Sequence, residues 1–262
     1  MTDASAVSQH INKTKLGALN KLMHLFHRCQ LFHRHHPPKP AFFPLYNRIS
    51  ITTSRIPYQE GVVLLANLWE EKFSAEGYLY GEEPNEFIRE HAWRLEGHKR
   101  VAALAEGEGR NAVFLARKGH EVTAWDYTQS GLIKTQQLAE RHHVRVETGQ
   151  KDLIHDSVPS GEYDASIMVF GHFLKKDQKT VFDKLVSVVK PGGIVMLEVY
   201  SEDQLVYGTG GPKSVDMVYD PADLLQWIKS YKVLHFFYGE QERVEGKGHT
   251  GTGHVIQAIL QK

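Results

Sequence analysis

The sequence predicts an α/β fold with a doubly wound, mostly parallel sheet of seven strands that ends in an antiparallel hairpin. From Lys99 onward, apolar runs of strand length alternate with stretches of helical period. Such alternation is typical of strand–helix–strand units, whose strands lie parallel. The last two apolar runs are separated only by a Gly-rich, charged stretch, which indicates a hairpin.

Composition places the chain among ordinary globular proteins. Its 262 residues are 41% hydrophobic and 24% charged, enough for one large α/β domain. The 31 Lys and Arg balance the 31 Asp and Glu, so we expect no nucleic-acid partner. The single cysteine, Cys29, excludes an internal disulfide framework and a Cys-rich zinc site. No run of about 18 apolar residues occurs, so we expect no membrane partner.

The first 66 residues differ in character from the rest of the chain. Residues 1–60 hold eight of the 31 Lys and Arg, only two of the 31 Asp and Glu, and half of the ten prolines. This basic, Pro/His-rich composition predicts a disordered extension or a targeting segment, followed by one domain over residues 67–262. His33, His35 and His36 have no carboxylate nearby, so no metal site is expected. The expected location is cytoplasmic, or an organelle if residues 1–60 act as a transit peptide.

Each element of the domain has its own signal. A helix is expected to begin at Pro84. Its apolar side would carry Phe87, Ile88, Trp93 and Leu95. Gly119 ends a later helix, and Lys190–Gly193 form a turn. The expected strands are residues 101–104, 122–125, 144–148, 163–170, 194–200, 233–238 and 254–260, and the other expected helices are residues 111–118, 130–141, 175–189 and 220–229.

Turns after three successive strands carry the residues of a nucleoside site. Gly107 and Gly109 precede a helix, where glycine lets a ligand approach the backbone and free N–H groups are exposed. Asp126 ends the second strand, where a carboxylate can accept hydrogen bonds from both ribose hydroxyls. Asp152 and Leu153 follow the third strand and suit the amine and the face of a purine. Each residue also has a purely structural interpretation, as a tight turn, a helix cap or a solvated loop.

The charges of the first turn favour a cationic nucleoside. Glu106 and Glu108 flank the glycines, and a carboxylate beside a helix start disfavours pyrophosphate. The third glycine of a dinucleotide site and the Lys-Ser/Thr of a P-loop are both missing. S-adenosylmethionine, with its sulfonium and amino acid end, fits these residues better.

Four stretches of the sequence resemble one protein family. They are WEEKFSAEGYLYGEEPNEF, AEGEGRNAVFLARKGHEVTAWDYTQ, KDL and FDKLVSVVKPGGIVMLEVY. The chain from about Asn67 to its end is similar to class I S-adenosylmethionine-dependent methyltransferases, in the branch near the tellurite-resistance and thiopurine methyltransferases. The resemblance implies a Rossmann-like fold, S-adenosyl-L-methionine as cofactor and a small-molecule acceptor with a thiol or chalcogen nucleophile. Implied cofactor contacts are Tyr80, Ala105, Glu106, Gly107, Gly109, Asn111, Asp126, Tyr127, Asp152, Leu153 and Phe170.

Two residues depart from the family pattern. Ala103 replaces an acidic residue early in the first motif, and Ala105 replaces its first glycine. Ala105 is small enough for a similar turn, and Glu106 or Glu108 would then supply the missing charge.

Methyl transfer from a sulfonium is an in-line displacement, so the enzyme can act mainly by aligning the reactants and excluding water. The candidate catalytic residues are His172, after the fourth strand, and Tyr200, at the end of the fifth. Tyr207 lies in a Gly-rich stretch that is expected to act as a mobile lid.

The stretch before the last strand adds a further group of candidates. Arg243, Lys247 and His249 are expected either to attract an anionic acceptor or to form a solvated hairpin tip.

Two other functions stay open at this point. A nicotinamide-dependent oxidoreductase has a similar sheet, and a non-catalytic cofactor-binding protein would explain Ala103 and Ala105. The expected assembly is a monomer or a weak homodimer.

Overall fold

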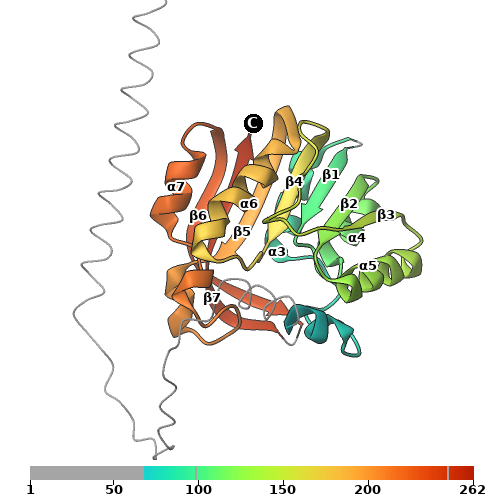
Figure 1. Cartoon of the computed structure of the whole chain (residues 1–262), viewed down its shortest axis with the longest axis horizontal. Coiled ribbons are helices and arrows are strands. Elements are labelled where there is room, and N and C mark those ends of the chain that lie inside the picture. The colour runs from blue at the N-terminus through green and yellow to red at the C-terminus, as the bar shows by residue number, and fades with distance from the viewer. Residues whose placement is uncertain (1–67, 98, 247) are drawn as a thin grey trace, which may run out of the picture. The chain divides into compact units, whose positions relative to one another are not determined.

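The computed structural model describes residues 68–97, 99–246 and 248–262. The predicted extension over residues 1–66, with its histidines, lies outside these residues, as does Lys247. The described strands form one seven-stranded sheet in the order β3-β2-β1-β4-β5-β7-β6 (Figure 1). The strands β1 to β5 pair in parallel, and β7 runs antiparallel between β5 and β6. The predicted fold class is therefore confirmed.

Strands and helices alternate along most of the chain. The strands are β1 (Arg100–Leu104), β2 (Glu121–Asp126), β3 (Val146–Gln150), β4 (Tyr163–Val169), β5 (Val189–Tyr200), β6 (Lys232–Glu245) and β7 (His249–Gln261). The α-helices are α3 (Glu86–His91), α4 (Arg110–Arg117), α5 (Gln129–Arg141), α6 (Lys175–Ser187) and α7 (Pro221–Ile228). Short 3-10 helices are η2 (Ala92–Leu95), η3 (Glu202–Val206) and η4 (Val215–Met217). None of the described helices has the length and apolar character needed to cross a bilayer.

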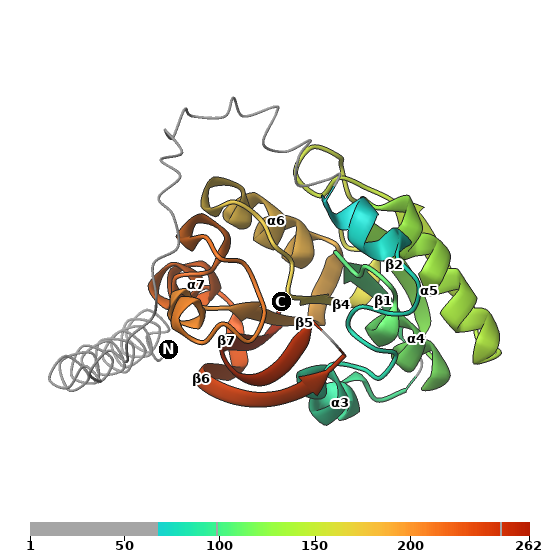
Figure 2. The same ribbon diagram turned by 90° about the horizontal axis from the view of Figure 1, so that it is seen from below.

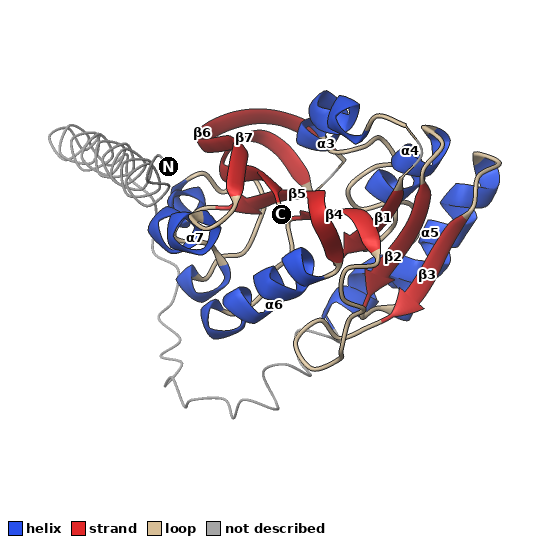
Figure 3. Cartoon of the chain, turned by 90° about the horizontal axis from the view of Figure 1, so that it is seen from above, coloured by secondary structure: helices blue, strands red, loops and turns tan. Residues whose placement is uncertain are grey.

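Helices cover both faces of the sheet. α6 packs against β4 and β5 and α7 against β6 on one face, with Phe182 and Leu224 buried there. On the other face α3, α4 and α5 pack, with Phe87 and Leu115 buried. Figures 2 and 3 show these two layers from below and from above. Burial of apolar surface on both faces provides the main stabilisation of the sheet.

The strand order places the candidate site. It reverses between β1 and β4, and parallel sheets bind ligands outside the carboxyl ends of the strands at such a reversal. The segments that follow β1, β2, β3 and β4 all leave this edge of the sheet. Gly107 lies in the first of them, Asp126 ends β2, and Asp152 follows β3.

The C-terminal hairpin is much longer than the sequence predicted. The Gly-rich stretch expected to be a loop pairs as strands down to Glu245 opposite His249. Arg243 and His249 are only 4% and 2% exposed, so the prediction of a solvated hairpin tip was wrong for both. The reason is tertiary, because aromatic side chains of the turn after β4, of β5 and of the segment before α3 cover them.

Two smaller expectations were also wrong. The turn predicted at Lys190–Gly193 is part of β5, with a register irregularity opposite Tyr163 and Ala165. Trp93 was expected on the apolar side of the helix, but its side chain is 59% exposed. The chain changes from α3 to the tighter η2 before Trp93, and that change of period turns its side chain outward.

Candidate functional site

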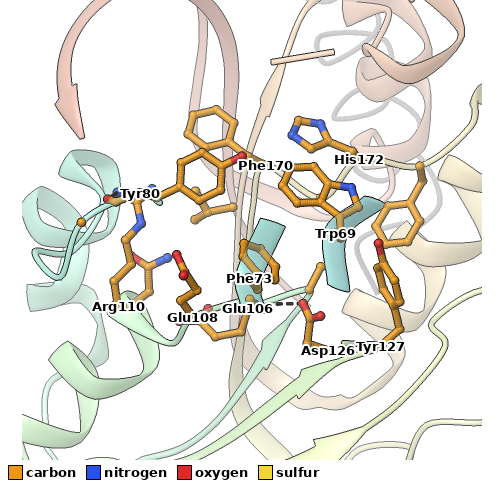
Figure 4. Close-up of a pocket in the computed structure, with 17 residues that line it drawn as sticks. Trp69, Phe73, Tyr80, Glu106, Glu108, Arg110, Asp126, Tyr127, Phe170 and His172 are labelled. Atoms are coloured by element: carbon orange, nitrogen blue, oxygen red, sulfur yellow. Dashed lines mark hydrogen bonds between the residues drawn. The ribbon is translucent and has the colours of Figure 1, made fainter. Parts of the chain in front are cut away.

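Two adjoining cavities lie at the carboxyl ends of β1, β2, β3 and β4. Their empty space, which includes open solvent, is about 700 and 660 Å³. Both are lined by Trp69, Ala105, Asp126, Tyr127, His172 and Phe173. Figure 4 shows the first cavity. The shared wall makes the two cavities one continuous site.

The turn between β1 and α4 folds back onto the end of β2. The Gly107 N–H donates a hydrogen bond of 2.8 Å to the Asp126 Oδ2 atom (Figure 4). Gly107 has φ of 61°, and Ala105 has φ of 51°, a left-handed conformation that disfavours any side chain. Both residues line the first cavity. The substitution of glycine by Ala105 is therefore compatible with the turn, at some conformational cost.

Gly109 has a different role from Gly107. It is not among the residues that line either cavity, and its φ of 88° lies in the left-handed region. A Cβ atom at this position would lie 2.5 Å from Thr135 Oγ1. Glycine at position 109 thus allows α4 to begin close against α5.

The two glutamates of the turn line the first cavity and also stabilise the turn. The Ala112 N–H donates to Glu106 Oε1 at 2.7 Å, which caps the first turn of α4 where Gly109 offers no side chain. Burial raises the pKa of Glu106 to about 7. Glu108 pairs with Lys134 at 2.8 Å. Both carboxylates therefore have protein partners and still face the cavity.

Asp126 lies at the junction of the two cavities. It is 4% exposed, and its Oδ1 atom accepts hydrogen bonds from the Thr128 N–H at 2.9 Å and the Thr128 hydroxyl at 2.6 Å. Burial raises the pKa of Asp126, although these hydrogen bonds oppose that effect. A carboxylate oxygen has two lone pairs, so Oδ2 can still accept from a ligand hydroxyl.

Asp152 and Leu153 line the second cavity. The Ile154 N–H donates to Asp152 Oδ1 at 2.8 Å, and the His155 Nδ1 atom lies 2.6 Å from Oδ2. Although burial raises it, the pKa of Asp152 lies below its ordinary value because of these contacts. Leu153 is buried and offers an apolar face.

The remaining predicted cofactor residues all line a cavity. Tyr80, Asn111 and Phe170 line the first, and Tyr127 lines both. Asn111 is fixed by the Asn85 N–H, which donates to its Oδ1 atom at 2.9 Å. Burial raises the pKa of Tyr80, so its hydroxyl stays protonated.

Several lining residues were not predicted from the sequence, among them Trp69, Phe73 and Arg110. Arg110 donates to Glu245 at 2.8 Å and to the Tyr80 carbonyl at 3.3 Å, so it ties the turn to the hairpin. The aromatic spacing of the WEEKF stretch was the available signal for Trp69 and Phe73. No local signal identifies Arg110, because its partners are far away in the sequence.

The two predicted catalytic residues lie in different surroundings. The His172 ring lines both cavities and stacks on Trp69, with 5.5 Å between the ring centroids and 11° between the planes (Figure 4). Burial, with the nearby His249 and Lys72, lowers the pKa of His172 to about 3, so it is neutral and only weakly basic. Tyr200 lines neither cavity and stacks on Phe170 with 4.4 Å between centroids.

Tyr207 lies apart from both cavities. Its hydroxyl donates to Glu240 Oε1 at 2.7 Å, across to β6.

The lining fits a sulfonium-bearing adenosine. The rings of Trp69, Phe73, Tyr80 and Phe170 surround the first cavity, and aromatic faces attract cations. Asp126 and Asp152 offer acceptors for ribose hydroxyls and a purine amine. Pyrophosphate would meet Glu106 and Glu108 instead of free N–H groups.

Comparison with known proteins agrees with this arrangement. Residues 101–193 match the model of a methyltransferase domain. The chain is 27% identical over 153 residues to tRNA 5-carboxymethoxyuridine methyltransferase from Escherichia coli strain K12, covering 50% of this chain and 58% of that protein. The match therefore spans less than two thirds of that relative.

Solved structures share the fold at low sequence identity. One, from a study of the conversion of a disulfide bond into a thioacetal group during echinomycin biosynthesis, has a TM-score of 0.62 and 13% identity, covering 76% of this chain and 90% of that chain. TehB from Haemophilus influenzae has a TM-score of 0.56 and 15% identity, and the match covers 75% of this chain and 66% of that chain.

The domain match, the sheet order and the cavities at the strand ends lead to one conclusion. Residues 101–193 match a methyltransferase domain, and the described residues have the Rossmann-like fold of S-adenosylmethionine-dependent methyltransferases.

Proposed function

We propose that the protein transfers the methyl group of S-adenosylmethionine to a small-molecule acceptor whose attacking atom is a thiol or another chalcogen. One observation supports the proposal most: the turns after β1, β2 and β3 line two adjoining cavities, and Asp126 belongs to both. A single adenosine-based ligand would contact all three turns from this position.

The chain's residues divide into groups along the site. The backbone of Ala105 and Gly107 would hold the amino acid end, Asp126 the ribose, and Asp152 with Leu153 the adenine. When bound, the cofactor supplies an activated methyl group on sulfur. The aromatic residues around the first cavity would then exclude water and orient the acceptor.

The character of His172 favours a nucleophile that ionises without help. A neutral histidine with a pKa of about 3 is a poor general base near neutral pH. A thiol has an ordinary pKa of about 8.5, so part of it is anionic without a strong base. We therefore assign His172 to acceptor contact rather than to proton abstraction.

A second candidate acceptor is a modified uridine in tRNA. The Escherichia coli relative is a tRNA 5-carboxymethoxyuridine methyltransferase, and this chain is 27% identical to it over 153 residues. A nicotinamide-dependent oxidoreductase is not favoured, because Glu106 and Glu108 face the cavity where a pyrophosphate would lie.

A turnover assay tests the proposal. The full chain is incubated with S-adenosylmethionine and either aromatic thiols, the matching phenols and anilines, or total tRNA, and S-adenosylhomocysteine is quantified. At a limiting concentration of S-adenosylmethionine, we expect product with thiols that falls in Asp126→Ala and is unchanged in Asp183→Ala, a change on the exposed side of α6. Product formed only with tRNA would contradict the small-molecule acceptor, and no product with any acceptor would contradict the proposal as a whole.

A further inference from the structure

A buried polar cluster lies behind the wall of the first cavity, and none of its residues lines either cavity. It consists of Arg243, Glu198, Tyr200 and His249, which are between 1% and 4% exposed. Among the described residues, three groups of this cluster have no hydrogen-bond partner. They are the guanidinium nitrogens of Arg243, both ring nitrogens of His249 and the Tyr200 hydroxyl. A buried donor without a partner is costly, so such a group indicates a missing ligand or solvent partner.

The cluster is separated from the first cavity by two ring side chains. The Arg243 guanidinium carbon lies 5.0 Å from the Phe170 ring centroid and 4.7 Å from that of Tyr200. The His249 ring lies 4.2 Å from the Tyr80 ring and 4.7 Å from the Phe170 ring, between centroids. Tyr80 and Phe170 both line the first cavity. Phe170 is therefore the ring that separates Arg243 from the first cavity.

Phe170 itself has a strained backbone. Its φ is 53°, in the left-handed region that bulky residues rarely occupy. Strain of this kind concentrates at ligand-binding sites. The strained residue stands at the boundary between the cavity and the cluster.

The described charged neighbours of Arg243 lie close to it but accept no hydrogen bond from its guanidinium. Arg110 and Glu245 form a close pair, at 2.8 Å. Arg243 and Glu198 lie 3.7 Å apart and are not hydrogen-bonded, and the second Glu198 oxygen accepts from Gln257 at 3.3 Å. Burial and the nearby Glu245 raise the pKa of Glu198 to about 7, so this carboxyl is partly protonated at neutral pH. Burial lowers the pKa of His249 to about 4, so it adds no charge.

Two glycines, Gly253 and Gly210, lie so close to the cluster that a side chain at either position would crowd it. A Cβ atom on Gly253 would collide with the Arg243 Nη2 atom. One on Gly210 would lie 3.2 Å from the Tyr200 hydroxyl and 3.1 Å from His249 Cδ2. The hairpin and the loop over it thus have no side chain where the arginine fork lies.

We propose that Arg243, with Tyr200 and His249, recognises a carboxylate carried by a planar, aromatic methyl acceptor. The planar guanidinium can bind a carboxylate through two parallel hydrogen bonds, and the Tyr200 hydroxyl can add a third. The flat faces of Phe170 and Tyr80 suit an aromatic ring. The carboxylate positions the acceptor, and a different atom of the acceptor receives the methyl group. This inference rests on the proposed function, because it names the class of molecule that binds beside the cofactor.

A binding experiment tests it without requiring turnover. The full chain, saturated with S-adenosylhomocysteine, is titrated with benzoate and, separately, with benzamide, its neutral analogue of the same shape. We expect benzoate to bind about tenfold tighter or better, since hydrogen bonds to a charged group are the stronger ones. Arg243→Gln should remove this preference and leave S-adenosylhomocysteine affinity within about twofold of the wild type. Lys179→Gln, the same charge change on exposed α6, should keep the preference.

Two further variants test the inference in case the Arg243→Gln protein does not fold. Arg243→Lys keeps the charge but not the paired donors, and Gly253→Ala displaces the guanidinium while the arginine stays. Both should weaken benzoate binding and leave benzamide binding unchanged. Equal affinity for benzoate and benzamide in the wild type, or a preference that survives Arg243→Gln or Gly253→Ala, would overturn the inference. Failure to bind S-adenosylhomocysteine would instead contradict the proposed function.

Discussion

At the residue scale, Asp126 is held in one orientation by its neighbours. The Gly107 N–H and the Thr128 N–H and hydroxyl fix the two carboxylate oxygens. Sequence position predicted that Asp126 ends a strand beside the glycine turn. It could not predict that the same carboxylate also closes that turn, because the Gly107 hydrogen bond spans 19 residues.

Asp126→Ala should weaken cofactor affinity by about 1–3 kcal/mol, the size expected for lost hydrogen bonds to a charged group. Calorimetric titration with S-adenosylhomocysteine measures this loss, and circular dichroism checks that the variant is folded. Wild-type affinity in a folded Asp126→Ala protein would remove Asp126 from the site.

His172 makes stability depend on pH in a known direction. Its pKa is about 3 when folded and about 6.5 when unfolded, so between these values the unfolded chain binds the proton and the folded chain does not. The stabilisation is therefore present above pH 6.5 and is lost as the pH falls toward 3. Relative to His172→Gln, the wild type should lose about 1–2 kcal/mol of unfolding free energy between pH 7.5 and pH 5. Urea denaturation of both proteins at the two pH values measures this, and parallel pH profiles would show that His172 is not buried in its neutral form.

At the element scale, local signals predicted β1 to β4 and the helices α4, α5 and α6 to within about two residues, but they missed the first part of β5. Strand-length apolar runs and stop signals such as Gly119 are properties of adjacent residues. The length of the β6–β7 hairpin was not predictable in this way. Its polar residues are buried against residues that are distant in the sequence. For example, the Asn85 side chain donates a hydrogen bond to Glu245, which is 160 residues away in the sequence.

The start of α4 gives a test at this scale. Gly109→Ala should lower the free energy of unfolding by about 2–4 kcal/mol, from the left-handed backbone and the clash with Thr135. The folded fraction should keep its cofactor affinity, since Gly109 lines neither cavity. Chemical denaturation and calorimetry separate the two effects. Loss of affinity without loss of stability would return Gly109 to the site, as the sequence had predicted.

At the scale of the whole molecule, the described residues contain a sheet covered on both faces. We predict that deleting residues 1–60 leaves the melting temperature and cofactor affinity unchanged. Thermal unfolding of the full and shortened chains, with and without S-adenosylhomocysteine, makes the comparison. A fall of several degrees in the shortened chain would mean that the deleted residues stabilise the domain.

The central claim is that the turns after β1, β2 and β3 together bind one sulfonium-bearing adenosine. Calorimetric titration of the full chain with S-adenosylmethionine and, separately, with NADH tests it most directly. We predict saturable one-to-one binding of S-adenosylmethionine and none of NADH. Tighter binding of NADH, or no heat from S-adenosylmethionine at millimolar concentration, would contradict it.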